Sequence, residues 1–236
     1  MAESYERRRP SYLPELVDWV AARLALGPGK TVVDVAAGTG KLTRQLAATG
    51  SRVIAVEPLD EMRAQLEAAV PGAESLPGRA EALPLPDGSA DAITVASAIH
   101  WFDLDRALPE FHRVLRPGGG LAVLGQGRAL DDPLQRALQE IVGRYLPDPA
   151  EYGSWRGEVE RSGLFGPPET IHGSFEQILD ADGLAERIAT ISYIARLSDE
   201  ERADVLAQVR AVGEAQPESP FPFRYGASAS VCYAVS

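Results

Sequence analysis

A glycine-rich stretch with acidic residues around it is the part of this sequence best suited to chemistry. Residues 32–43 read VVDVAAGTGKLT, a turn that contains Gly38 and Gly40. Asp34 comes just before the turn, and a second acid, Glu57, follows downstream. Glycine allows a positive φ and a close approach of backbone to a ligand, and an ionised carboxylate accepts several hydrogen bonds. The stretch is therefore typical of nucleotide-binding loops, of which three kinds compete.

Two phosphate-binding patterns do not fit the stretch. A P-loop needs Gly at position 35 and Ser or Thr at position 42, where this chain has Val35 and Leu42. The dinucleotide fingerprint needs a third glycine at position 43, where this chain has Thr43. The P-loop fails, and the NAD-binding loop is disfavoured. A negative charge at Glu57 would also repel the 2′-phosphate of NADP.

Strands and helices alternate around this turn. The predicted strands are 31–36, 52–58, 91–98 and 121–127, and the predicted helices are 41–50, 59–70 and 105–115. Such alternation predicts an α/β fold with a doubly wound, mostly parallel sheet, whose ligand lies beyond the carboxyl ends of the strands. The turn and both acids fall at such ends.

The pattern becomes mainly helical after residue 127. The predicted helices are 131–146, 183–197 and 199–212, and the predicted strands are 169–177 and 227–236. We interpret this half as a helical cap inserted into the later strands of the sheet, rather than as an independent domain.

Composition limits the class of partner. The chain has 236 residues and is 45% hydrophobic, which predicts a single globular domain. Its net charge of −11 disfavours nucleic acid, whose phosphates need a basic face, and favours a small molecule. The sequence contains no apolar run of membrane-spanning length, so we expect no membrane association and a cytoplasmic location. Abundant alanine with few lysines indicates a bacterial source.

The sulfur and imidazole side chains predict no metal centre. Cys232 is the only cysteine, so one chain can form neither a disulfide nor a cysteine-built metal site. His100, His112 and His172 do not share metal-ligand spacing. We therefore expect no bound metal.

Four further segments, together with residues 32–43, resemble the class I S-adenosylmethionine-dependent methyltransferases, and within them the small-molecule enzymes similar to trans-aconitate methyltransferase. The segments are YERRRPSYLPELVDWV (5–20), GRAEALPLPDGSAD (78–91), ASAIHWFD (96–103) and RVLRPGGGLAVL (113–124). Three positions depart from the family pattern: the first turn glycine is Ala36, a frequent Asp is Arg79, and the usual proline of the lid helix is Leu13.

The resemblance implies the fold and the cofactor. It implies a seven-stranded, mostly parallel sheet with an α-helical cap insertion, built by residues 1–236 as one domain. Residues 1–126 would form the cofactor-binding core with an N-terminal lid helix, 127–225 the cap and later strands, and 226–236 the terminal strand. The cofactor would be S-adenosylmethionine, which leaves as S-adenosylhomocysteine. The resemblance leaves the oligomeric state open.

The resemblance also assigns roles to the cofactor residues. Glu57 would hydrogen-bond the two ribose hydroxyls, and Asp34 would reach the amino group, although it could instead cap a helix. The Ala80 amide and the Glu81 carboxylate would read the adenine edge, although Glu81 could instead be a solvated loop acid. The full implied set is Tyr12, Asp34, Ala36, Gly38, Thr39, Gly40, Glu57, Pro58, Ala80, Glu81 and Ser97.

The candidate residues for the methyl acceptor follow the fourth strand or lie in the cap. His100 could act as a general base, or it could fix its loop by hydrogen bonding. Trp101 could offer a ring face to the sulfonium, or it could pack the lid against the sheet. Tyr193 would line the acceptor pocket from the cap, while Tyr5 and Tyr12 would close over the methionine carboxylate.

The predicted reaction is methyl transfer to a small-molecule acceptor by in-line displacement at the sulfonium. Because the methyl group is already activated, alignment and exclusion of water would supply most of the catalysis. Two alternatives stay open: a protein that binds the cofactor without transferring its methyl group, as a lyase, a cyclase or a regulator, and a nucleotide-dependent oxidoreductase.

Overall fold

The computed structural model describes residues 11–128, 132–146 and 154–235, which fall into two compact units. The described residues of the larger unit are 11–126, 154–173 and 227–235. Those of the smaller unit are 127–128, 132–146 and 174–226. In the described part of the chain, every helix is too short or too polar to span a bilayer.

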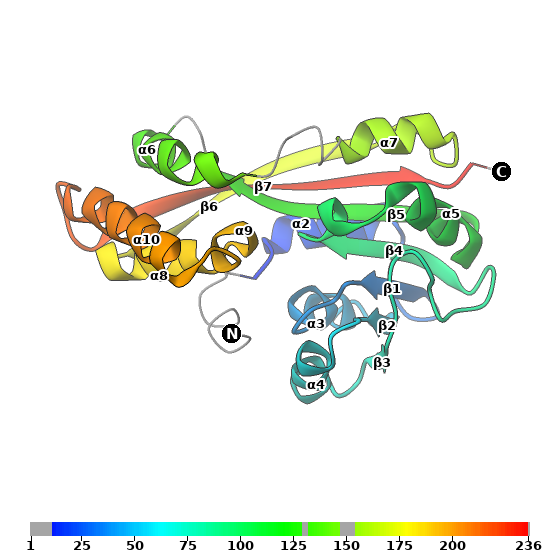
Figure 1. The fold of residues 1–236 in the computed structure, drawn as a ribbon. Helices are drawn as coiled ribbons and strands as arrows, with labels where there is room; N and C mark the ends of the chain where they lie inside the picture. The colour runs from blue at the N-terminus through cyan, green and yellow to red at the C-terminus, as the bar shows by residue number, and fades with distance from the viewer. Residues whose placement is uncertain (1–10, 129–131, 147–153, 236) are drawn as a thin grey trace. The chain divides into compact units, whose positions relative to one another are not determined.

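Across the described residues the strands form one seven-stranded sheet in the order β3-β2-β1-β4-β5-β7-β6 (Figure 1). The strands are β1 (Thr31–Val35), β2 (Arg52–Val56), β3 (Glu74–Leu76), β4 (Ala90–Ala96), β5 (Leu115–Arg128), β6 (Glu169–Leu179) and β7 (Phe221–Tyr233). The pairs β1/β2, β1/β4, β2/β3 and β4/β5 are parallel. Gly119 meets Ala234 while Gly125 lies beside Ser228, so β7 runs antiparallel to β5. The predicted mostly parallel, seven-stranded sheet is confirmed.

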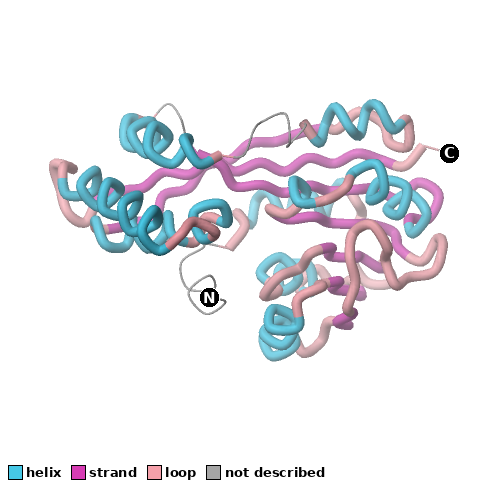
Figure 2. Tube along the Cα trace, viewed as in Figure 1, coloured by secondary structure: helices cyan, strands magenta, loops and turns pink. Residues whose placement is uncertain are grey.

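Helices connect these strands, as Figure 2 shows in cyan. The larger unit contains α2 (Pro14–Arg23), α3 (Lys41–Ala47), α4 (Asp60–Ala69), the 3₁₀ turn η1 (Ile99–Trp101), α5 (Leu104–Val114) and α7 (Trp155–Ser162). The smaller unit contains α6 (Pro133–Val142), η2 (Gly143–Tyr145), α8 (Ala181–Ala189), α9 (Ser192–Ala195) and α10 (Asp199–Glu214). The sequence marks several helix starts: Pro14 opens α2, the Asp132 carboxylate caps α6, and Ser198 with Glu201 forms a capping box on α10.

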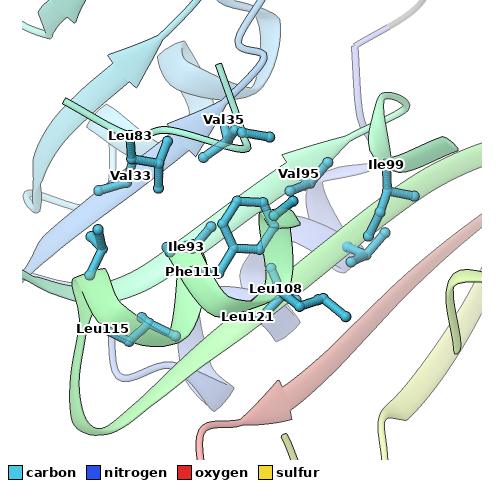
Figure 3. Packing of buried hydrophobic residues seen from close by; sticks show 14 of the residues in the cluster. Val33, Val35, Leu83, Ile93, Val95, Ile99, Leu108, Phe111, Leu115 and Leu121 are labelled. Atoms are coloured by element: carbon cyan, nitrogen blue, oxygen red, sulfur yellow. The ribbon is translucent and has the colours of Figure 1, made fainter. Parts of the chain in front are cut away.

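The core of the larger unit lies between α5 and the parallel strands. Figure 3 shows Phe111 and Leu108 of α5 packed with Ile93, Val95 and Leu121. All five side chains are buried, and each contributes about 1.5–3 kcal/mol by leaving water. This packing fixes β1, β4 and β5 side by side, and therefore fixes the loops at their carboxyl ends.

The smaller unit has a hydrophobic core of its own. Its buried residues come from α6, α8, α9 and α10, from the end of β6 and from the first half of β7, and they include Leu138, Leu184 and Val205. Phe175 of β6 stacks on Tyr225 of β7 with ring centroids 4.8 Å apart. These contacts make the unit compact by itself.

Some elements differ from the sequence-based expectation. The predicted helix at 183–197 is broken into α8 and α9, because the Thr190 hydroxyl donates to the Arg187 carbonyl and Ile191 adopts an extended conformation. Two elements, β3 and α7, were not predicted at all, since β3 has only three residues and α7 contains Gly157, a weak helix former. Strands β5 and β7 each begin about six residues before the predicted position.

The start of α3 packs closely on α4 at Gly40, where a side chain would press on two residues of the α4 segment. Gly40 has φ +86°, and a Cβ atom there would lie 3.1 Å from Leu66 and 3.3 Å from Val70. Gly38 also has a positive φ, +58°, but a Cβ atom there would meet nothing within 4 Å. A side chain at Gly38 would therefore meet only backbone strain, whereas a side chain at Gly40 would meet backbone strain and steric overlap.

We expect Gly40→Ala to lower the free energy of unfolding by about 2 kcal/mol or more, because it adds overlap with Leu66 to the strain of a positive φ. Gly38→Ala, the matched control, should cost only the backbone strain, roughly 1 kcal/mol. Urea denaturation of both variants measures the difference. Equal losses would show that α4 does not limit position 40.

Candidate functional site

The glycine turn after β1 has the conformation that a backbone-lined binding site needs. Ala36, Gly38 and Gly40 all adopt left-handed φ, at 55°, 58° and 86°. Ala36 holds this conformation as a non-glycine residue, which stores strain of a kind that clusters at functional sites. Thr39, between the glycines, is buried. With open space beside Gly38, the turn leaves its backbone approachable.

Glu57 ties this turn to the end of β2. Its side chain is only 3% exposed, and it follows directly after β2. Its Oε2 accepts a hydrogen bond from the Gly38 amide at 2.9 Å, and its Oε1 accepts one from the Leu59 amide at 3.0 Å. A carboxylate oxygen has capacity for a further hydrogen bond. The pair of oxygens can therefore shape the turn and still accept from two ligand hydroxyls.

Asp34, within β1, is buried with 1% exposure and lies among threonines. Its carboxylate accepts hydrogen bonds from the Thr43 hydroxyl at 2.6 Å and the Thr94 hydroxyl at 3.0 Å. Burial raises the pKa of Asp34 to about 6, the nearby Glu57 charge adds to the rise, and the two hydroxyls oppose it. The carboxylate thus joins β1, β4 and the first turn of α3.

Thr43 and Thr94, the partners of Asp34, are residues of this candidate site that sequence reasoning missed. A signal for Thr43 was present, because it occupies the position where the dinucleotide pattern requires glycine. In the structure the hydroxyl at that position binds Asp34. Thr94 lies in the middle of β4, where a buried strand threonine is unremarkable in sequence.

Tyr12 and Ser97, predicted from separate segments, come together. The Tyr12 hydroxyl donates to Ser97 Oγ at 3.2 Å, and the Tyr12 carbonyl accepts from Gln45 of α3 at 2.9 Å. Ser97 follows β4 with φ 55°, a second strained non-glycine residue at a carboxyl strand end. These bonds connect the segment before α2 to β4 and α3. Tyr5 lies outside the described residues.

The two residues predicted to read the adenine edge, Ala80 and Glu81, lie in the loop between β3 and β4. Ala80 is buried, and the Glu81 carboxylate accepts a hydrogen bond from the Asp103 amide at 3.1 Å, at the start of α5. Pro58 is exposed beside Glu57, and Leu59 is 56% exposed. The exposed Leu59 side chain provides apolar surface close in the chain to the buried Glu57 carboxylate. The sequence pattern did not predict a role for Leu59.

His100 and Trp101 form η1, just beyond β4. Their ring centroids are 4.9 Å apart at 45°, His100 is exposed, and Trp101 is 41% exposed. Tyr193 belongs to the smaller unit, where it lies partly buried against that unit's core. Ser97, His100 and Trp101 therefore lie on the one segment that follows β4. Tyr193 lies in the other compact unit.

Replacing the buried Asp34 carboxylate by an amide should stabilise the protein in a pH-dependent way. A carboxyl whose pKa rises on folding binds its proton more tightly in the folded state, so wild-type stability falls as pH rises from about 4 to about 6. We expect Asp34→Asn to raise the free energy of unfolding above about pH 7 by up to about 3 kcal/mol, and to give no gain near pH 4.

Urea denaturation at a series of pH values measures this dependence. Asp18→Asn, the same change at an exposed position of α2, serves as the control and should shift stability little at any pH. A gain for Asp34→Asn that does not change between acid and neutral pH would contradict the role of burial.

Comparison with known proteins gives a consistent assignment. Residues 33–123 match the family model for a methyltransferase domain. An uncharacterized methyltransferase of Mycobacterium tuberculosis is 40% identical over 207 residues, which cover 88% of this chain and 81% of that protein.

Solved structures share the fold. A proposed type II methyltransferase from Anaeromyxobacter dehalogenans matches with TM-score 0.66 and 24% identity, over 95% of this chain and 97% of that chain. A SAM-dependent methyltransferase from Aquifex aeolicus matches with TM-score 0.54 and 20% identity, over 97% of each chain. A 40% identical methyltransferase aligns with most of this chain, a methyltransferase family model matches residues 33–123, and Glu57 closes the glycine turn. This chain therefore belongs to the class I S-adenosylmethionine-dependent methyltransferases.

Proposed function

We propose that this enzyme transfers the methyl group of S-adenosylmethionine to a small-molecule acceptor by in-line displacement. The observation that carries the proposal is the buried Glu57 carboxylate at the end of β2, hydrogen-bonded to the Gly38 amide of a left-handed turn. The net charge of −11 favours a small acceptor over a nucleic acid, whose backbone it would repel. The likeness to the trans-aconitate methyltransferase subgroup stays a prediction.

The residues at the turn fit this cofactor. Glu57 uses one amide hydrogen bond on each oxygen, which leaves each able to accept from a ribose hydroxyl. Gly38 lacks the Cβ that would fill the space beside the turn, so its backbone can approach a nucleoside. Leu59 offers an apolar surface suited to a base, close to that carboxylate along the chain. When bound, S-adenosylmethionine supplies a methyl group activated by its positive sulfonium.

In this proposal Asp34 has two roles: its hydrogen bonds position the start of α3, and its negative charge attracts the cofactor. Its oxygens hold Thr43 and Thr94, so the carboxylate orients the first turn of α3 against β1 and β4. When ionised, it is a negative charge at low dielectric near the turn, and it would attract the ammonium group of the cofactor. A pKa of about 6 means that Asp34 is largely ionised at neutral pH. The buried charge therefore disfavours stability but favours a cationic ligand.

The acceptor end is formed by the segment after β4. Tyr12 holds Ser97 through its hydroxyl, and the strained backbone at Ser97 directs the chain into η1. His100 is exposed there and able to take a proton from an acceptor hydroxyl or amine, since imidazole titrates near neutral pH. The partly exposed Trp101 offers an apolar face beside it. We propose that the acceptor contacts these two rings. The assignment of Tyr193 to the acceptor pocket stays a prediction, because Tyr193 belongs to the smaller unit.

Glu57→Gln should weaken cofactor binding. An amide in place of the carboxylate loses the charged hydrogen bonds, each worth about 1.5–3 kcal/mol, and turns an NH₂ group toward one of the backbone amides. We expect the dissociation constant for S-adenosylhomocysteine, measured by calorimetry, to rise at least about tenfold.

Glu61→Gln is the matched control, because it makes the same charge change at an exposed position on α4. Its dissociation constant should equal that of the wild type. Unchanged affinity in Glu57→Gln, with the fold intact by denaturation, would remove Glu57 from the site.

A transfer assay tests the role of His100. With tritiated S-adenosylmethionine and a panel of small hydroxyl, amine and acidic-carbon compounds, an accepted compound acquires the label. For such a compound we expect His100→Gln to lower kcat by about 10²-fold and to abolish the acidic limb of the pH–rate profile.

Full turnover in His100→Gln would assign the residue to loop structure. Binding of S-adenosylhomocysteine without labelling of any compound would instead favour the alternative function, a cofactor-binding protein that does not transfer the methyl group.

A further inference from the structure

A cavity of about 170 Å³ lies at the amino ends of β1, β4 and β5. Its lining includes Arg23, Lys30, Asp91, Arg116 and the glycines 118–120, all within the larger unit. We call it the amino-end cavity. Lys30 precedes β1, whereas the glycine turn follows β1, so the cavity and the methyl-transfer site lie at opposite ends of the same strand. Ligands of doubly wound sheets bind at the carboxyl ends, and the fold rule does not account for this cavity.

The cavity is cationic in an acidic protein. Three of its lining side chains are positive, those of Arg23, Lys30 and Arg116, and one is negative, that of Asp91. Lys30 Nζ lies 3.0 Å from Asp91 Oδ1, and Arg116 binds the other oxygen of the same carboxylate. Two cations therefore share one acid. Since the whole chain carries a net charge of −11, this is a local reversal of sign.

The cavity keeps a positive excess because two cations face one carboxylate, which a backbone amide also stabilises. The Thr31 amide donates to Asp91 Oδ2 at 2.9 Å. Burial opposes its ionisation, but the hydrogen bonds from the Thr31 amide and Lys30 and the charge of Arg116 hold the pKa of Asp91 below its usual range. After one cation has balanced this carboxylate, a full positive charge stays on the wall. Arg23 is oriented by Glu169, an exposed acid that does not line the cavity.

The backbone of the cavity wall has the form that admits a ligand. Gly118 has φ +78°, and a Cβ atom there would meet nothing within 4 Å. A Cβ atom at Gly119 would lie 2.9 Å from the Asp91 carbonyl, and one at Gly120 would lie 2.5 Å from Leu24. On the facing segment Ala25 has φ 50°, a strained conformation for a residue with a side chain. The wall is therefore closely packed at its base and open at Gly118.

We propose that the amino-end cavity binds a compact oxyanion, a phosphate or carboxylate group, at a site separate from methyl transfer. Guanidinium and ammonium groups bind such oxygens through charge-assisted hydrogen bonds, and Arg116 and Lys30 present both kinds at one wall. The volume is several times the roughly 30 Å³ that one water occupies in the liquid, which suits a group of phosphate size.

The test is titration with inorganic phosphate, followed by ³¹P NMR and calorimetry at constant ionic strength, with S-adenosylhomocysteine held at saturation. We expect phosphate to bind the wild-type protein under these conditions. Lys30→Gln and Arg116→Gln should each weaken it at least about tenfold, because each removes one of the charged donors. Both variants leave Asp91 with the Thr31 amide and one cation.

Arg52→Gln is the matched control. Arg52 pairs with Thr31 in the β1/β2 register, and its side chain forms an exposed ion pair with Glu74 outside the cavity lining. This variant should bind phosphate as the wild type does. Acetate in place of phosphate distinguishes a general carboxylate site from one selective for phosphoryl groups, and binding of either anion by the same residues supports the proposal.

The proposal would be overturned by no phosphate or acetate binding to the wild type, by equal weakening in Arg52→Gln, or by loss of binding when S-adenosylhomocysteine fills the methyl-transfer site. If removal of Lys30 or Arg116 unfolds the protein, Arg23→Gln replaces these variants in the test, because Arg23 forms its ion pair with Glu169 and not with Asp91. Unchanged phosphate affinity in Arg23→Gln would then also exclude the site.

Discussion

The hydrogen bond from the Gly38 amide to the buried Glu57 carboxylate is the constraint on which the site depends. It joins the loop after β1 to the end of β2, and so it stabilises a turn in which Ala36 must adopt a positive φ. That turn sets where α3 begins, and the first turn of α3 carries the Thr43 hydroxyl to Asp34. One buried carboxylate thus orders both the backbone of the glycine turn and the helix start that holds the second buried acid.

Much of the sheet was predictable because β-branched runs and glycine stops mark β1, β2, β4 and β5 in the sequence. The glycine turn and Glu57 were predictable for the same reason, since motif spacing places them at strand ends. The bonds of Asp34 were not, because Thr94 is 60 residues away and only the sheet register brings it close. The break between α8 and α9 at Thr190 was not predictable either, since it coincides with a single hydrogen bond from the Thr190 side chain to the backbone. The assignment of Tyr193 and His100 to an acceptor stays a prediction.

Two acids, Asp34 and Glu57, lie buried near the carboxyl ends of the neighbouring strands β1 and β2, an arrangement that opposes stability. Burial of Asp34 and the charge of Glu57 favour the protonated form of Asp34, while the two threonine hydroxyls favour the ionised form. Natural cores avoid such pairs unless a function needs them, because an apolar pair of similar size packs at lower cost. The strained backbones of Ala36 and Ser97 lie at the same ends. Unfavourable terms are therefore concentrated where we propose that the cationic cofactor binds.

The boundary between the two compact units cuts through strands rather than between them. β5, β6 and β7 each supply residues to both units, so the chain passes from one unit to the other several times. A fragment ending at residue 126 would lack β7, the neighbour of β5, and would leave β5 as an open edge prone to aggregation. No single contiguous module can replace the smaller unit. Substitutions and loop insertions in the smaller unit therefore act on strands whose pairing continues into the larger unit.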